Sequence, residues 1–242
     1  MGRGLSRRRL VGAGLLGALP VAATAATFRG EMPWSGGATA PEGASGGSKY
    51  VFFTGAEAAF IEAATARMIP KDELGPGALE AGVPVFLDRQ LAGSFGAGTR
   101  WYMQGPWPKG TPTQGYQGRM PPADFYRAAI AAIDMAVGHS ASGKTFNTLE
   151  AADQDAFLGK LEKGQVDLGN VDGKAFFAMF VQNVIEGFWS DPIYGGNKDM
   201  VGWTLIGFPG AHYDYAPYVL KHGERYPLPP VGLKGRPAWT KD

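Results

Sequence analysis

Few residues in this chain of 242 amino acids combine a reactive side chain with a spacing that supports chemistry. The three histidines are scattered at His139, His212 and His222, without the H-x-x-x-H or H-E-x-x-H spacing that places two imidazoles on one helix face. Cysteine is absent, which excludes disulfides, thiolate metal sites, iron–sulfur ligation and C-x-x-C-H haem attachment. The sequence therefore predicts neither a histidine nor a thiolate metal centre.

Carboxylates are the next candidates, because paired acids can act as general acid and general base. One group lies between residues 72 and 88 and comprises Asp72, Glu73, Glu80 and Asp88. Acids that flank helix starts more often cap the helix or complement its dipole, so we interpret this group as structural. A second group, Asp191, Asn197 and Asp199, offers oxygen ligands for a hard cation but lacks the spacing of an EF-hand.

The amino terminus has the layout of an export signal, with a basic segment, an apolar run from Leu10 to Leu19 and then small residues. Its basic segment carries the twin arginine of the Tat pathway. We predict a signal peptide over 1–25, cleaved after an A-x-A site, with an uncleaved membrane anchor as the alternative. The targeting residues are Ser6, Arg7, Arg8, Leu10, Ala23 and Ala25.

Residues 12–17 match the G-x-G-x-x-G dinucleotide fingerprint, which functions only between a strand and a helix. Here the match lies inside the apolar part of the signal, so we reject it. Four arginines lie in the first 25 residues, and without them the remainder is slightly acidic. No basic stripe remains to neutralise phosphates, and we expect no nucleic-acid partner.

The elements after the signal read as helices joined by long Gly-, Pro- and aromatic-rich loops. Residues 26–49 are rich in Gly, Ala, Ser and Pro and predict a flexible tether. Residues 50–242 predict a single all-α domain, an irregular bundle of about five helices. Apolar spacing, caps and prolines place these helices at 54–69, 77–91, 122–137, 149–163 and 172–189.

The helix predicted over 172–189 is apolar on every side, which is typical of a helix buried at the centre of a core. Asp172 is its expected N-cap, and Asp191-Pro192 ends it, because the residue before proline is forced out of the α region. The loop that follows, over 190–211, is rich in glycine and aromatics. From composition it is either packing that covers the core or a recognition surface.

Three segments resemble the small (gamma) subunit, subunit 3, of membrane-bound gluconate 2-dehydrogenase and related FAD-dependent sugar dehydrogenases. They are the twin-arginine start over 6–11, the segments 69–72 and 76–82, and the long run 187–197 continuing to 202–203 and 207–211. The resemblance covers nearly the whole mature chain. It implies a non-catalytic subunit without a cofactor of its own, an expected member of an oxidoreductase complex.

In such complexes, the resemblance implies, FAD is held by a large GMC-type subunit and haem c by a multihaem cytochrome c subunit that reduces membrane quinone. The small subunit stabilises the flavoprotein and escorts it through the Tat pathway to the periplasm, where the complex is peripheral to the inner membrane through its partners. The residues expected at the partner interface, or in the core beneath it, are Trp189, Asp191, Pro192, Tyr194, Asn197, Trp203 and Phe208.

Two other functions remain open at this stage. The 190–211 loop could make the chain a periplasmic sugar- or metal-binding module that acts alone. The chain could also be an oxidoreductase without partners, although it shows no catalytic centre. In the subunit hypothesis the partner sets the substrate, so gluconate, 2-ketogluconate, fructose, sorbitol and glucose all remain open.

Overall fold

The fold comes from a computed structural model, which describes residues 49–235 except 109, 112 and 142. All six predicted targeting residues, from Ser6 to Ala25, lie outside the described residues, as does all but the last residue of the predicted tether. The described part is all-α, as predicted, with isolated bridges in place of strands. It has six α-helices, against about five predicted: α2 (Gly55–Met68), α3 (Val83–Ala92), α4 (Pro122–Ser140), α5 (Ala151–Glu162), α6 (Gly173–Trp189) and α7 (Val201–Ile206).

The helix starts of α2 and α6 follow the predicted caps. At α2 the Glu57 carboxylate accepts the Thr54 N–H at 2.8 Å while the Thr54 hydroxyl accepts the Glu57 N–H at 3.3 Å, which completes a capping box. At α6 the Asp172 carboxylate accepts the Ala175 N–H at 3.0 Å. These side chains satisfy amide groups that a helix start otherwise leaves without partners.

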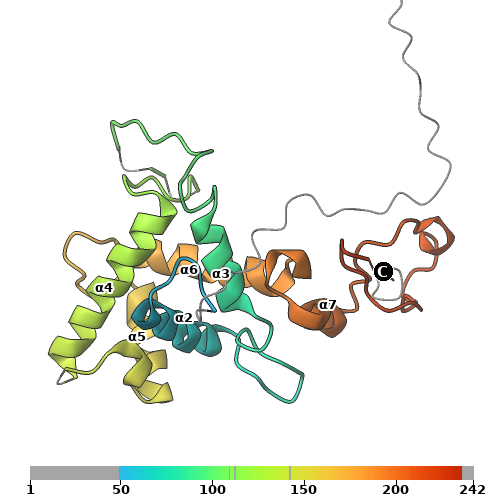
Figure 1. The fold of residues 1–242 in the computed structure, drawn as a ribbon, viewed down its shortest axis with the longest axis horizontal. Coiled ribbons are helices and arrows are strands. Elements are labelled where there is room, and N and C mark those ends of the chain that lie inside the picture. The colour runs from blue at the N-terminus through green and yellow to red at the C-terminus, as the bar shows by residue number, and fades with distance from the viewer. Residues whose placement is uncertain (1–48, 109, 112, 142, 236–242) are drawn as a thin grey trace, which may run out of the picture. The chain divides into compact units, whose positions relative to one another are not determined.

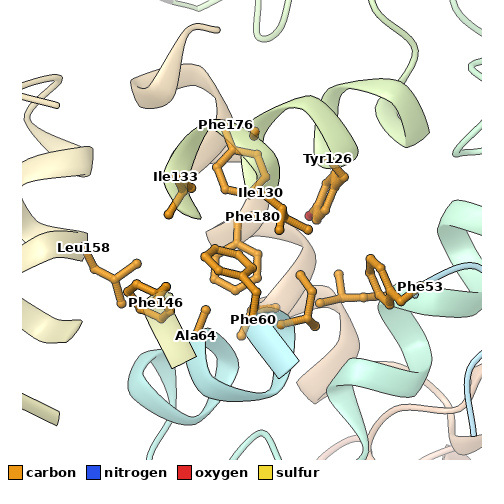
Figure 2. Close-up of a cluster of buried hydrophobic side chains, with 14 of the residues drawn as sticks. Phe53, Phe60, Ala64, Tyr126, Ile130, Ile133, Phe146, Leu158, Phe176 and Phe180 are labelled. Carbon is orange, nitrogen blue, oxygen red and sulfur yellow. The ribbon is translucent and has the colours of Figure 1, made fainter. Parts of the chain in front are cut away.

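Helix α6 lies at the centre of the core, as its apolar composition predicts, and α2 to α5 gather around it (Figure 1). Figure 2 shows Phe176 and Phe180 of α6 among Phe60 of α2 and Tyr126 of α4. The rings of Phe176 and Phe180 stack with their centroids 6.0 Å apart. One strip of α6 nevertheless reaches solvent, where Ile185 is 44% exposed.

Two predicted boundaries are wrong. The helix expected over 77–91 begins only at Val83, because the chain turns first at Gly82, whose φ of 76° is left-handed. Ahead of it the backbone packs on the end of α2, since the Ala78 N–H donates to the Ile69 carbonyl at 2.8 Å. Helix α4 also runs past the expected end at Val137, so His139 lies in its last turn.

Among residues 49–235, with the gaps noted above, no helix combines the length and the apolar character needed to cross a membrane.

Candidate interaction surface

Two of the seven residues predicted for partner contact lie inside the chain. Asn197 has no exposed surface, and Trp203 is 6% exposed. The Asn197 side-chain amide donates to the Ser190 carbonyl at 2.8 Å, and its oxygen accepts the Gly202 N–H at 2.8 Å. The Trp203 indole N–H donates to the Trp189 carbonyl, also at 2.8 Å. Both side chains therefore fasten α7 to the end of α6 from beneath the surface.

The other predicted interface residues lie at or near the surface. Tyr194 is 50% exposed and Phe208 is 46% exposed, whereas Trp189, Asp191 and Pro192 are partly buried. The 190–211 loop therefore places some of its aromatic rings in the core and others at the surface; recognition by the exposed rings stays a prediction.

The side-chain carboxylate of Asp191 accepts backbone N–H groups from two parts of the chain that are distant in sequence, and so joins them. One carboxylate oxygen accepts the Ile193 N–H at 2.9 Å, and the other accepts the Leu233 N–H at 2.7 Å. With Asn197 also bonded to backbone, two members of the predicted oxygen cluster are already engaged. This arrangement supports the loop instead of presenting those oxygens to a cation.

The turn between η2 (Pro192–Tyr194) and α7 is strained. Asn197, Asp199 and Met200 have φ values of 45°, 56° and 57°, and they are the non-glycine residues with positive φ in the described part of the chain. Such conformations cost of order 1–3 kcal/mol each and concentrate at functional sites. The strain coincides with η3 (Lys198–Met200), which leads directly into α7.

Residues 198–209, which begin within this turn and include α7, form a surface segment that we call the 198–209 ridge. Its exposed side chains include three apolar ones, Leu205 at 48%, Ile206 at 62% and Phe208 at 46%. The polar side chains of Lys198, Asp199 and Thr204 are exposed beside them. Its inner side is held by the bonds of Asn197 and Trp203 described above. The sequence analysis does not single out Leu205 and Ile206, because their apolar character alone does not tell a core position from a surface one.

Hollows lie along the 198–209 ridge. One of about 530 Å³ is lined by Val201, Thr204 and Leu205 together with residues of the 69–76 segment. Another of about 380 Å³ is lined by Trp203, Phe208 and neighbours on the ridge together with the 225–230 segment. Leu205 thus lines one hollow and Phe208 lines the other.

The candidate catalytic acids serve the backbone. Asp88 is 1% exposed, and its carboxylate accepts the N–H groups of residues 51, 52 and 53 at 2.8, 2.8 and 2.9 Å. Glu80 accepts the Gly77 N–H at 3.1 Å, and Asp72 accepts the Leu74 N–H at 2.8 Å. These three of the four acids each hold a turn or a chain segment, which agrees with a structural role for them.

The three histidines lie in different surroundings. His139 and His222 are exposed, and a ring nitrogen of His212 lies 3.1 Å from the Pro229 carbonyl oxygen. Within the described residues, no group of three or more His, Asp or Glu side chains could hold a metal ion.

A buried polar chain, which sequence reasoning did not foresee, crosses from α4 to α6. The Tyr126 hydroxyl, fully buried, donates to the side-chain oxygen Oδ1 of Asn183 at 2.8 Å. The side-chain nitrogen of Asn183 donates to the Glu186 carboxylate at 3.2 Å. Burial raises the pKa of Tyr126 well above its usual value, and the Glu186 charge adds to the rise. The only sequence signal is that Gln182, Asn183 and Glu186 interrupt the apolar run of α6.

This polar chain opens into a cleft of about 580 Å³ on the exposed strip of α6. One wall carries the rings of Phe95, Trp101 and Tyr116. The α6 side of the cleft is mixed: it includes Ala178 and Met179 as well as Gln182 and Glu186. The side chains of Gln182 and Glu186 hydrogen-bond to each other at 2.9 Å. Aromatic faces opposite polar groups suit a ligand with both apolar and hydroxyl surfaces.

The comparisons with known proteins give one match. A family model described as gluconate 2-dehydrogenase subunit 3 matches residues 55–210, which run from the start of α2 through the 198–209 ridge. Searches of curated proteins and of solved structures found no match.

Proposed function

We propose a function from one premise, which is that this chain belongs to the gluconate 2-dehydrogenase subunit 3 family. We infer that it is the non-catalytic small subunit of a periplasmic, FAD-dependent dehydrogenase of gluconate or a related sugar. Its partners are a GMC-type FAD-binding subunit and a multihaem cytochrome c subunit, which hold FAD and haem c. The small subunit stabilises the flavoprotein and escorts it through the Tat pathway.

The family match over 55–210 is the observation that carries this proposal. Two features of the fold support it. The acids that could have served catalysis, including Asp88, accept backbone N–H groups. The 198–209 ridge instead offers apolar side chains to solvent, which suits the centre of a subunit interface.

The export part of the proposal rests on Arg7 and Arg8. The Tat route carries folded proteins, so a chain with this signal can bring along a bound, FAD-loaded partner that has no signal of its own. The signal then serves two proteins, and the escort depends on a contact that survives transport.

Exchange of both arginines for lysine tests the escort. With Arg7→Lys and Arg8→Lys together, we expect this chain and the co-expressed flavoprotein to remain in the cytoplasm, because lysine keeps the charge but loses the planar guanidinium. Arg3→Lys, in the same basic segment but outside the pair, is the control and leaves both proteins exported. Normal delivery of the flavoprotein to the periplasm with the pair exchanged contradicts the escort.

A second candidate function is sugar binding by the chain alone, and the cleft beside Trp101 and Glu186 favours it. Sugars stack their C–H faces on aromatic rings and hydrogen-bond to amides and carboxylates. Isothermal titration of the purified chain with gluconate, glucose and calcium separates the two functions. Binding heat that disappears in Trp101→Ala supports the binding module, whereas no heat with any of these ligands contradicts it.

A further inference from the structure

We propose that the 198–209 ridge is the anchor by which this chain docks on the FAD-binding subunit, with Leu205, Ile206 and Phe208 at the centre of the contact. This inference rests on the proposed function and specifies which surface of the chain carries it.

Three apolar side chains of the ridge are exposed to solvent. Leu205, Ile206 and Phe208 lie within four residues of one another, and each exposes 46–62% of its surface. Single exposed apolar residues are ordinary, but neighbouring ones that share a surface mark an interaction site. Burying such side chains in a contact removes apolar area from water and supplies the driving force for association.

The base of the ridge is already fixed to the end of α6. Asn197 and Trp203 bond to the end of α6, and the Phe208 N–H donates to the Trp203 carbonyl at 2.8 Å. The rings of Trp203 and Phe208 meet edge to face, with centroids 5.1 Å apart. A preorganised surface loses little conformational entropy on binding, which favours a tight contact.

The surface beside the ridge is concave. Hollows of about 530 Å³ and 380 Å³ adjoin it, one shared with the 69–76 segment and one with the 225–230 segment. A stable interface needs on the order of 800 Å² from each partner, more than three side chains supply. A partner that covers the ridge therefore extends into these hollows. There it also meets Leu74 and Leu228, which are 72% and 45% exposed.

The protein that binds the ridge can be inferred from the family match and from the proposed escort through the Tat pathway. The family model describes a subunit and includes the ridge in the matched residues, so the expected occupant is another subunit and not a second copy of this chain. Of the two proposed partners, the flavoprotein is the one that must stay bound during export. The 198–209 ridge is accordingly assigned to it.

A matched pair of double variants tests the assignment. Leu205→Ser with Ile206→Ser removes two side chains from the ridge, exposed to 48% and 62%. Ile185→Ser with Met135→Ser removes two helical side chains of similar exposure, 44% and 62%, from α6 and α4. Both variants are purified and checked for wild-type helix content and a cooperative thermal transition, and their affinity for the FAD-loaded subunit is measured.

We expect the ridge variant to raise the dissociation constant about tenfold or more, since side chains at the centre of an interface dominate its affinity. The control variant changes it by less than about twofold. Equal binding by both variants overturns the inference and leaves the proposed function standing. If the wild-type chain does not bind the flavoprotein, the proposed function fails as well.

Two further outcomes identify a different occupant. If the ridge variant only abolishes self-association of the isolated chain, measured by sedimentation, the ridge is a contact between copies and the inference is overturned. If it weakens binding of the cytochrome subunit and leaves the flavoprotein affinity unchanged, the assignment to the flavoprotein is likewise wrong.

Discussion

The side-chain amide of Asn197 donates to the backbone carbonyl of Ser190 across 2.8 Å, which joins the strained turn to the end of α6. The same side chain accepts the Gly202 N–H at 2.8 Å, so a single fully buried residue fixes where α7 begins. Asparagine suits this position because it tolerates the observed φ of 45° better than most residues. The Asn197 amide is therefore one of the main links of the turn to α6, beside the indole of Trp203.

We predict that Asn197→Ala lowers the free energy of unfolding by about 2–4 kcal/mol, because it leaves the Ser190 carbonyl and the Gly202 N–H without partners. Urea unfolding followed by circular dichroism measures the change. Asn147→Ala is the control, since Asn147 is exposed and makes one side-chain hydrogen bond; it shifts stability by less than about 0.5 kcal/mol. Similar values for the two variants contradict the role of Asn197.

We predict that loss of the Asp88 carboxylate destabilises the start of the described chain, at residues 51–53. Asp88→Ala removes the common acceptor of the N–H groups of residues 51, 52 and 53, and we expect a loss of about 2–4 kcal/mol. Hydrogen exchange of these three amides accelerates in the variant more than exchange in α4. Asp167→Ala, which removes one bond to Gly169 in an exposed turn, serves as the comparison.

An unchanged exchange rate at residues 51–53 in Asp88→Ala contradicts this account. It would mean that solvent or other groups already satisfy those amides, and that Asp88 is buried for another reason.

The helices that carry their own local signals could be predicted from the sequence. Helix α2 starts with the capping box of Thr54 and Glu57, and α6 starts with the cap Asp172. Both signals lie within a few residues of the helix start, so these helices can be predicted without knowledge of the fold. Helix α3 is different, because it starts only after the left-handed turn at Gly82, and the segment before it is bonded to the end of α2 through Ala78 and Ile69. Tertiary packing overrides helix propensity there.

The candidate surface was harder to foresee for a similar reason. Helix α7 has six residues, too few to show a helical period, and its N-cap Met200 has a left-handed φ of 57°. Asn197 lies among glycines and reads as a surface turn residue, yet it is buried. The sequence could indicate that the 190–211 loop matters, but only the fold separates its buried rings from its exposed ones.

Gly196 gives a third prediction, because its backbone passes close to α6. A Cβ atom at this position would lie 2.1 Å from the Gly187 carbonyl oxygen, and a backbone atom cannot move aside cheaply. We expect Gly196→Ala to lower the free energy of unfolding by about 2–3 kcal/mol. The same substitution at Gly159, inside α5 and with nothing within 4 Å of the added atom, should raise stability by about 0.5–1 kcal/mol.

Each glycine variant adds one methyl group. Opposite changes in unfolding free energy would therefore show the effect of the space available at each position. Thermal unfolding measured in parallel checks them. If Gly196→Ala is as stable as the wild type, the close approach of the 190–211 loop to α6 is wrong.

The last prediction concerns pH and the carboxylate of Glu62, which accepts hydrogen bonds from the Tyr50 hydroxyl and, at 3.0 Å, from the Lys49 ammonium. The Tyr50 bond is the main cause that lowers the pKa of Glu62 below its ordinary value of 4.5; partial burial opposes it and Lys49 adds to it. A carboxyl with a lowered folded-state pKa stabilises the fold above its unfolded pKa. That stability is lost as the pH falls from 4.5 through the folded pKa.

Glu62→Gln should therefore be less stable than the wild type at pH 7, by less than about 1 kcal/mol because the pair is partly exposed to solvent. The two curves of unfolding free energy against pH should converge as the pH falls below 4.5, where the wild-type carboxyl also becomes neutral. Tyr50→Phe keeps the carboxylate but removes the main hydrogen bond, so it should raise the pKa of Glu62 measured by NMR titration. Parallel curves for wild type and Glu62→Gln down to pH ~3 would show that the pKa of Glu62 is the same in the folded and unfolded chains.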